Sequence, residues 1–408
     1  MNIRCAGEGY CGTAAGAGGP VSLYIHIPFC VRKCRYCDFL SGPSDEGTVL
    51  RYLEALEREI RAKASWLSSV TACSSLPEAD TIFIGGGTPS LLTSRQLDHL
   101  MFVLSSCFLI DDDAEITLEC NPGTADEEKL RAFGRSGINR LSIGVQSFRD
   151  DELRLLGRIH TAEQARTCIE NARRAGFTDL NLDLMSALPG QTHAQWMENL
   201  AEAVSHGPEH ISAYSLILED GTALKEMEEN GALPAFPDED EDRRMYHDTK
   251  TFLAEHGYCR YEISNYARPG FESRHNNGYW TGHPYLGLGL GASSYLILRG
   301  GERVRWSGTR DMQTYLRESG ETKGILCAAE ALSRQDQMAE FMFLGLRRVR
   351  GVSERDFAGE FGQTVDEVYG RVVQRWLGLG LLQRSDGYLS LTDAGIDVSN
   401  TVMADFLL

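Results

Sequence analysis

The sequence predicts an α/β fold, a partial (β/α)6 barrel followed by a C-terminal helical domain similar to a winged helix. Six apolar strand patterns alternate with helical patterns between residue 22 and about residue 257. Such alternation with short loops requires a parallel sheet with right-handed crossovers, and six units are too few for a closed eight-stranded barrel. An open barrel is therefore favoured over a flat doubly wound sheet. In either fold, ligands gather at the carboxyl ends of the strands.

Composition limits the class of protein. The 408 residues include 42% hydrophobic ones, enough for one large core and a smaller domain. A formal charge of -18 argues against general nucleic-acid binding, which needs a basic face. Eleven cysteines without a signal-peptide pattern predict a reducing, cytoplasmic location. No apolar run reaches eighteen residues, so only peripheral contact with the inner membrane face stays open.

Residues 1–20 are rich in Gly and Ala without periodicity and predict a flexible leader. Cys5 and Cys11 lie in this leader. They could be additional ligands or redox partners, but incidental cysteines in an irregular tail explain them more simply.

The first strand is predicted at residues 22–27, followed by helical spacing of leucines between residues 50 and 60. Further helices are expected near residues 95–104 and 126–135. The other strands are expected at residues 81–84, 115–120, 141–146, 180–185 and 211–218. An acidic stretch at 238–242 suits the N-terminus of a helix that ends near Gly257.

Clustered glycines at residues 287–291 predict close passage of the backbone beside another surface. After about residue 310 the pattern becomes helical, clearest at 332–349 and 365–377, and ends in a hairpin with its turn at Asp386 and Gly387. The predicted domains are 1–20, 21–309 and 310–408. A winged helix could bind DNA, but the acidic balance favours a lid or a partner surface.

Three cysteines, Cys30, Cys34 and Cys37, stand within eight residues directly after the first apolar run. This spacing lets thiolates reach one inorganic centre. A structural zinc site normally takes four protein ligands, and the next cysteine, Cys73, is far along the chain. A [4Fe-4S] cluster with one open iron fits better. An amino acid's amine and carboxylate can chelate that iron, and S-adenosylmethionine carries both groups.

Other candidate residues surround this loop. Tyr36 precedes the third cysteine and could contact the adenine or simply be a packed aromatic. The run from Gly85 to Thr88 ends the second strand, where missing side chains would let a ligand's amine approach the backbone. Such runs also make ordinary turns, but the place one βα unit after the cysteine loop favours ligand binding.

Four polar residues fall at or just beyond strand ends. Together they could hold ribose hydroxyls and a carboxylate, although each alone would be an ordinary loop or capping residue. Arg158 offers the fork that a carboxylate requires. The four are Glu119, Gln146, Arg158 and Asp183.

The string from His275 to Trp280, His-Asn-Asn-Gly-Tyr-Trp, combines an imidazole with two aromatic rings between glycine-containing turns. It could be a haem site with His275 as the axial ligand. A packed loop whose histidine only forms hydrogen bonds is the alternative, and chemistry alone favours it.

These motifs resemble the radical S-adenosylmethionine superfamily, and more narrowly the group containing oxygen-independent coproporphyrinogen III oxidase (HemN) and the haem chaperone HemW. The likeness runs from about Ser22 to the C-terminus and includes the strings at residues 84–90 and 144–148. It implies that the three cysteines hold the cluster. The residues implied to contact its S-adenosylmethionine are Tyr24, Gly86, Gly87, Thr88 and Glu119, with Tyr36 added by position. The oxidases place a second S-adenosylmethionine with residues at positions that match Gln146, Arg158, Asp183 and Ile217 here.

Several features favour the chaperone branch of this group. The oxidase motif has a fourth cysteine where this chain has Phe39, and the oxidases have a longer N-terminal region. The string from Glu119 to Gly123 and the motif at His275 also match the chaperone branch, in which the latter is the proposed haem-binding element. The resemblance thus implies haem binding, through His275, and delivery to client haemoproteins.

Two other functions stay open. One is oxidative decarboxylation of coproporphyrinogen III to protoporphyrinogen IX. The other is a cluster-carrying interaction protein without turnover.

Overall fold

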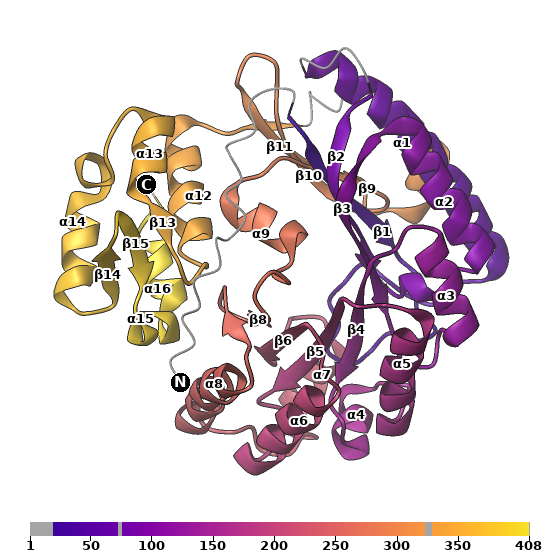
Figure 1. The fold of residues 1–408 in the computed structure, drawn as a ribbon, viewed down its shortest axis with the longest axis horizontal. Coiled ribbons are helices and arrows are strands. Elements are labelled where there is room, and N and C mark those ends of the chain that lie inside the picture. The colour runs from indigo at the N-terminus through magenta and orange to yellow at the C-terminus, as the bar shows by residue number, and fades with distance from the viewer. Residues whose placement is uncertain (1–18, 72–75, 323–328, 408) are drawn as a thin grey trace.

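The computed structural model describes residues 19–71, 76–322 and 329–407. The predicted leader, with Cys5 and Cys11, falls outside these residues except at its last two positions. Figure 1 shows a curved sheet covered by helices on its outer side and a separate C-terminal domain facing its open side. The fold is therefore the predicted α/β barrel, open on one side, with a helical C-terminal domain.

One twelve-stranded sheet forms the barrel. The six predicted strands lie side by side and parallel, in chain order. Most of their residues are buried on both faces, as parallel strands covered by helices require. Their bounds are β1 (Val21–Ile27), β2 (Glu78–Gly86), β3 (Leu109–Cys120), β4 (Arg140–Gln146), β5 (Leu180–Ser186) and β6 (His210–Ser215).

The sixth strand is shorter than predicted. Its pairing with β5 ends at Ser215, opposite Ser186, where β5 itself ends. Leu216, Ile217 and Leu218 therefore follow the strand instead of extending it.

The glycine-rich segment contributes a seventh parallel strand, β9 (Tyr285–Leu288), beside β1. A Cβ at Gly287 would meet the backbone carbonyl of Ser293, so the predicted close passage of backbone occurs here within one sheet. Five short strands extend the sheet edges: β7 (Cys259–Arg260), β8 (Asn265–Ala267), β10 (Ser293–Ile297), β11 (Arg303–Ser307) and β12 (Glu330–Ala331).

Helices cover the outer face of the sheet (Figure 1). Three of them begin with a capping box, in which a threonine and a glutamine three residues later satisfy each other's backbone N–H groups. The helical elements between β1 and β7 are α1 (Glu46–Val70), the short η1 (Pro89–Leu91), α2 (Ser94–Cys107), α3 (Glu127–Arg135), α4 (Asp150–Leu156), α5 (Ala162–Ala175), α6 (His193–Ser205), α7 (Ala223–Glu229) and α8 (Glu239–Glu255).

The His275 motif is a helix, α9 (Arg274–Thr281), and the packed loop suggested as one interpretation is wrong. Ser273 caps its N-terminus, and Glu115 on β3 accepts the N–H groups of Arg274 (2.7 Å) and His275 (3.1 Å). A carboxylate at this end favours a helix. Gly282 ends it in the left-handed conformation. In Figure 1, α9 lies on the concave side of the sheet.

The C-terminal domain has its own apolar core, built around Met342, Phe357, Val373, Leu389 and Phe406. A three-stranded sheet with order β13-β15-β14 forms the wing. Its strands are β13 (Val352–Ser353), β14 (Leu382–Ser385) and β15 (Tyr388–Leu391); its helices are α12 (Arg334–Gly345), α13 (Glu354–Phe361), α14 (Val365–Gly378), α15 (Asp393–Asp397) and α16 (Ser399–Ala404).

Helix α10 (Met312–Glu318) packs with the barrel. The hydroxyl of its Tyr315 donates to Glu59 on α1 at 2.7 Å, and the ring belongs to the barrel core. We therefore propose a domain division near residue 332 in place of the predicted 310.

Ion pairs connect the two domains. Arg303 on β11 lies 2.6 Å from Glu360, and Arg305 contacts both oxygens of Glu340 at 2.7 and 2.8 Å. On the other side, Lys250 of α8 lies 2.6 Å from Asp393. Within the residues described, no helix is long and apolar enough to cross a membrane.

Candidate functional site

The three cysteines lie in the loop that follows β1 at the carboxyl edge of the sheet, where their spacing predicted them. Backbone hydrogen bonds hold this loop: the N–H of Cys30 donates to Gly42 O, and that of Arg35 to Leu156 O, both at 3.0 Å. The three thiols are neither buried nor fully exposed. The backbone of the loop is thus fixed, and its three sulfur atoms lie near the surface.

A chain of side-chain hydrogen bonds joins two of the thiols. Thr88 Oγ1 donates to the sulfur of Cys30 (3.6 Å) and accepts from Asn121 Nδ2 (2.8 Å). Asn121 Oδ1 accepts from Arg158 Nη2 (2.7 Å), and Arg158 Nη1 donates to the sulfur of Cys34 (3.7 Å). We call Thr88, Asn121 and Arg158 the thiol relay. Sequence reasoning missed Asn121 as a site residue, although its place just after β3, beside Glu119, is the signal that could have found it.

The donor set fits the predicted cluster better than a single metal ion. Among the described residues, no three His, Cys, Asp or Glu side chains converge on one ion. The three thiolates of a four-iron cluster do not need to converge on one atom, because each binds a different iron of the same cluster. Burial raises the pKa of Cys37, and a metal must displace that proton on binding.

The glycines at the end of β2 are required by the chain itself. Gly86 has φ +107°, and a Cβ there would collide with the His26 ring. A Cβ at Gly87 would lie 2.7 Å from the carbonyl of Phe29. These glycines let β2 approach the cysteine loop closely. Their predicted contact with a ligand remains a prediction.

The carboxyl groups of Glu119 and Asp183 and the phenol of Tyr24 interact with one another. We call the region around them, beside the cysteine loop, the mouth. Burial and the nearby Asp183 carboxylate raise the pKa of Glu119 to about 8, although Glu119 accepts the Gly86 N–H at 2.9 Å. Burial also raises the pKa of Asp183. The pKa of Tyr24 is raised well above its usual value by burial and by Glu119, and its hydroxyl lies 3.0 Å from His26 Nδ1. A cationic ligand here would relieve the unfavourable burial of these acids.

Gln146 is the last residue of β4, and Tyr36 lies in the cysteine loop. Gln146 is a non-glycine residue with φ 65°, and its Oε1 accepts from the hydroxyl of Tyr214 at 2.9 Å. Such backbone conformations concentrate at functional sites. Tyr36 packs against the cluster of Leu156, Met185 and Leu188, which favours the packed-aromatic interpretation, and burial raises its pKa.

Two predicted site residues lie outside this mouth. Ile217 is 71% exposed beyond the end of β6. His275 is 1% exposed and lies behind the mouth on α9. Its Nδ1 is 2.7 Å from Thr81 Oγ1 and its Nε2 is 2.9 Å from the hydroxyl of Tyr279. Burial lowers its pKa to about 3, so the ring is neutral with both nitrogens engaged. This conformation leaves no nitrogen for an iron.

Family models match two parts of the chain. The radical SAM superfamily model matches residues 24–203, and the HemN C-terminal domain model matches residues 332–398. The first match spans the cysteine loop and the strands up to α6. The second begins where the apolar cores divide the two domains.

Relatives in several organisms match nearly the full chain. Heme chaperone HemW of Bacillus subtilis is 37% identical, covering 95% of this chain and 99% of that protein. The Lactococcus lactis heme chaperone HemW is 35% identical, with 95% and 98% covered. A mouse mitochondrial radical S-adenosyl methionine domain-containing protein 1 is 33% identical, with 95% and 87% covered.

Among solved structures, coproporphyrinogen III oxidase (HemN) from Escherichia coli superposes with a TM-score of 0.80. It is 23% identical, and the match covers 95% of this chain and 90% of that one. At this identity the likeness shows the fold, a radical SAM barrel with a C-terminal helical domain.

Proposed function

Because the chain belongs to the HemW family of radical SAM proteins, we propose that it is a haem chaperone, which binds haem and passes it to client haemoproteins. The observation that carries the choice between chaperone and oxidase is Phe39, which stands, 63% exposed, where the oxidases have a fourth cysteine. The relatives named heme chaperone agree with this choice over nearly the whole chain. We expect the protein to act in the cytoplasm, with peripheral membrane contact as a further expectation.

The family implies a [4Fe-4S] cluster and S-adenosylmethionine as cofactors. We assign the cluster to Cys30, Cys34 and Cys37 and the S-adenosylmethionine on it to the mouth formed by Tyr24, Gly86, Gly87, Thr88, Glu119 and Tyr36. When bound, the cluster supplies an electron to the sulfonium. The chain's own residues position the thiols through the thiol relay and offer Glu119 to the ligand's cation. A second S-adenosylmethionine would use Gln146, Arg158, Asp183 and Ile217.

Two assays on the anaerobically reconstituted full chain test the function. Haem titration should shift the Soret band with saturation, and incubation with coproporphyrinogen III, reductant and S-adenosylmethionine should yield no decarboxylated porphyrin. A haem titration without a saturable shift would contradict the chaperone function. Formation of protoporphyrinogen IX would establish the oxidase.

The haem ligand is a separate question. The family motif assigns it to His275, and His275→Ala should then weaken the Soret shift. An unchanged spectrum and affinity in the folded variant would show that the two hydrogen bonds of His275 are its role and that the iron lies elsewhere.

A further inference from the structure

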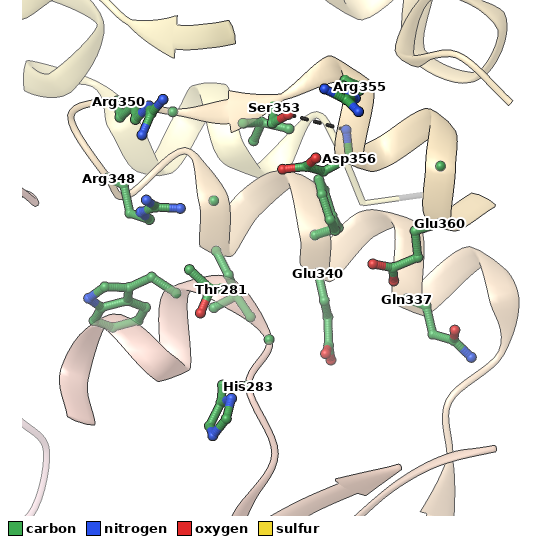
Figure 2. Close-up of a pocket in the computed structure, with 18 of the residues that line it drawn as sticks. Thr281, His283, Gln337, Glu340, Arg348, Arg350, Ser353, Arg355, Asp356 and Glu360 are labelled. Atoms are coloured by element: carbon green, nitrogen blue, oxygen red, sulfur yellow. Dashed lines mark hydrogen bonds between the residues drawn. The ribbon is translucent and has the colours of Figure 1, made fainter. Parts of the chain in front are cut away.

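A cavity of about 500 Å³ lies between the barrel and the C-terminal domain. Its walls come from the end of α9 and the turn after it, from β10 and β11, and from α12 and α13 (Figure 2). The volume is typical of small-molecule sites. None of its lining residues belongs to the mouth around the cysteine loop.

The inner walls of this interdomain cavity are largely apolar. Trp280 and Tyr295 come from the barrel, and Phe341, Leu344 and Val352 come from the C-terminal domain. Three arginines, Arg348, Arg350 and Arg355, stand along the edge formed by the C-terminal domain (Figure 2). The combination suits a flat apolar ligand with negative charges at one end.

The charges of the lining favour an anion. Two of its carboxylates, Glu340 and Glu360, are already paired with Arg305 and Arg303 of β11. Asp356 is the third acid of the lining, which also contains Arg348, Arg350 and Arg355. In a chain of formal charge -18 this local excess of positive charge is unusual. Guanidinium groups bind carboxylates with two parallel hydrogen bonds, which water alone does not offer.

We infer that the interdomain cavity is the haem site, with the propionates on Arg350 and Arg355 and the ring between the apolar walls. The inference rests on the proposed function and places the haem beside the end of the His275 motif, whose Trp280 lines the cavity, and not on His275 itself. It agrees with the engagement of both nitrogens of His275. His283 is the histidine in the lining, opposite Arg350 and Arg355 in Figure 2, and its Nε2 lies 3.0 Å from Asp80.

Carboxylate recognition is tested by comparing haem with haem dimethyl ester. We expect the wild-type chain to bind haem about tenfold more tightly than the ester, the effect of one partly screened charge-assisted hydrogen bond. The exposed Arg350→Gln, Arg355→Gln double variant should lose this preference. Equal binding of both compounds by the wild type, or a full preference in the double variant, would overturn the inference while leaving the chaperone function intact. Absence of haem binding by the wild type would contradict both the chaperone function and the haem site in the cavity.

Filling the cavity gives an independent test. Gly359 lines it on α13, and a Cβ there would meet nothing within 4 Å, so Gly359→Trp adds bulk without a backbone clash. Gly370 on α14 is equally open but lies outside the lining, which makes Gly370→Trp the matched control. We expect about a tenfold weaker haem affinity in the first variant only, with unchanged iron content in both. Equal haem affinities of the Gly359 and Gly370 variants would show that haem does not bind in this cavity.

Discussion

The cysteine loop and helix α9 carry the two most distinctive strings of the chain, and the fold treats them in opposite ways. In the loop, backbone contacts fix the main chain and leave three sulfur atoms near the surface. In α9, the imidazole of His275 is buried and both its nitrogens are engaged. The comparison shows which groups the fold leaves available for chemistry.

The difference follows from local geometry. The three cysteines of the loop have two or three residues between them, and packing within the loop alone does not account for this spacing. His275 and Tyr279 stand four residues apart on one helix, a spacing that brings side chains into contact. The residues of a motif on a helix can therefore pack against one another inside the protein and need not bind a ligand. Four experiments test this difference.

The largest effect is expected at the cysteines. Cys34→Ala should abolish cluster assembly, because a cubane with two protein thiolates has no stable attachment and the relay loses an acceptor. The measurement is iron and sulfide content after anaerobic reconstitution. Cys107→Ala, a buried free cysteine on α2, is the control and should keep the cluster. Full iron in the Cys34 variant would remove the loop from the site.

The next effect is at the glycine end of β2. Gly86→Ala should lower the free energy of unfolding by about 3 kcal/mol, since it adds a clash with His26 to a left-handed backbone. Gly207→Ala also has a positive φ but open space around it, so it should cost only about 1 kcal/mol. Urea denaturation measures both. Equal costs would mean that the close approach is not tight in solution.

His275→Ala should cost about 2 to 4 kcal/mol of stability, because it leaves a cavity and two buried hydroxyls without their partner. The exposed His256→Ala, whose ring bonds only its own helix, is the control and should cost below about 1 kcal/mol. Urea denaturation of the ligand-free protein again gives the numbers. A variant as stable as wild type would contradict the packing role that separates α9 from the cysteine loop.

The last prediction concerns pH. The pKa of Glu119 is about 8 in the folded chain and near 4.5 when unfolded. Between these values the folded state holds a proton that the unfolded state has released, so the unfolding free energy falls as pH rises through this window. Glu119→Gln removes this contribution. The variant should therefore gain stability relative to wild type from pH 5 to pH 8. A constant difference would show that Glu119 ionises normally.

Much of the barrel could be predicted from the sequence, because its six central strands are long apolar runs bounded by helices. Strand β9 could not, since its four residues include Gly287 and become a strand only by pairing with β1. The strands of two residues at the sheet edges exist through tertiary contacts alone. Helix α9 was missed although its N-cap, Ser273, is local, because the Glu115 carboxylate that also accepts N–H groups of its first turn lies 159 residues away from Arg274.

The site shows the same division. Spacing alone grouped the cysteines. Of the residues predicted at strand ends, Glu119 lies near the end of β3, whereas Asp183 lies within β5 and Arg158 follows α4. The thiol relay depends on which strand ends are neighbours, and Arg158 reaches Asn121 from 37 residues along the chain. The state of His275 depends on Thr81, 194 residues away. Hydrogen bonds between distant segments are invisible to a pattern along one segment.

The charged joint between the two domains has a mechanical consequence. Arg303, Arg305 and Lys250 connect the barrel to the C-terminal domain through carboxylates, of which Asp393 is exposed and Glu340 and Glu360 are largely buried. Dissolved salt weakens such pairs, since charges are screened over about 10 Å at 0.1 M ionic strength, whereas the apolar core of each domain is untouched. Added salt should therefore weaken the polar part of the contact between the domains, while the packing of Tyr246 and Ile263 against the C-terminal core persists. Rising salt concentration should speed the exchange of whatever occupies the space between the domains.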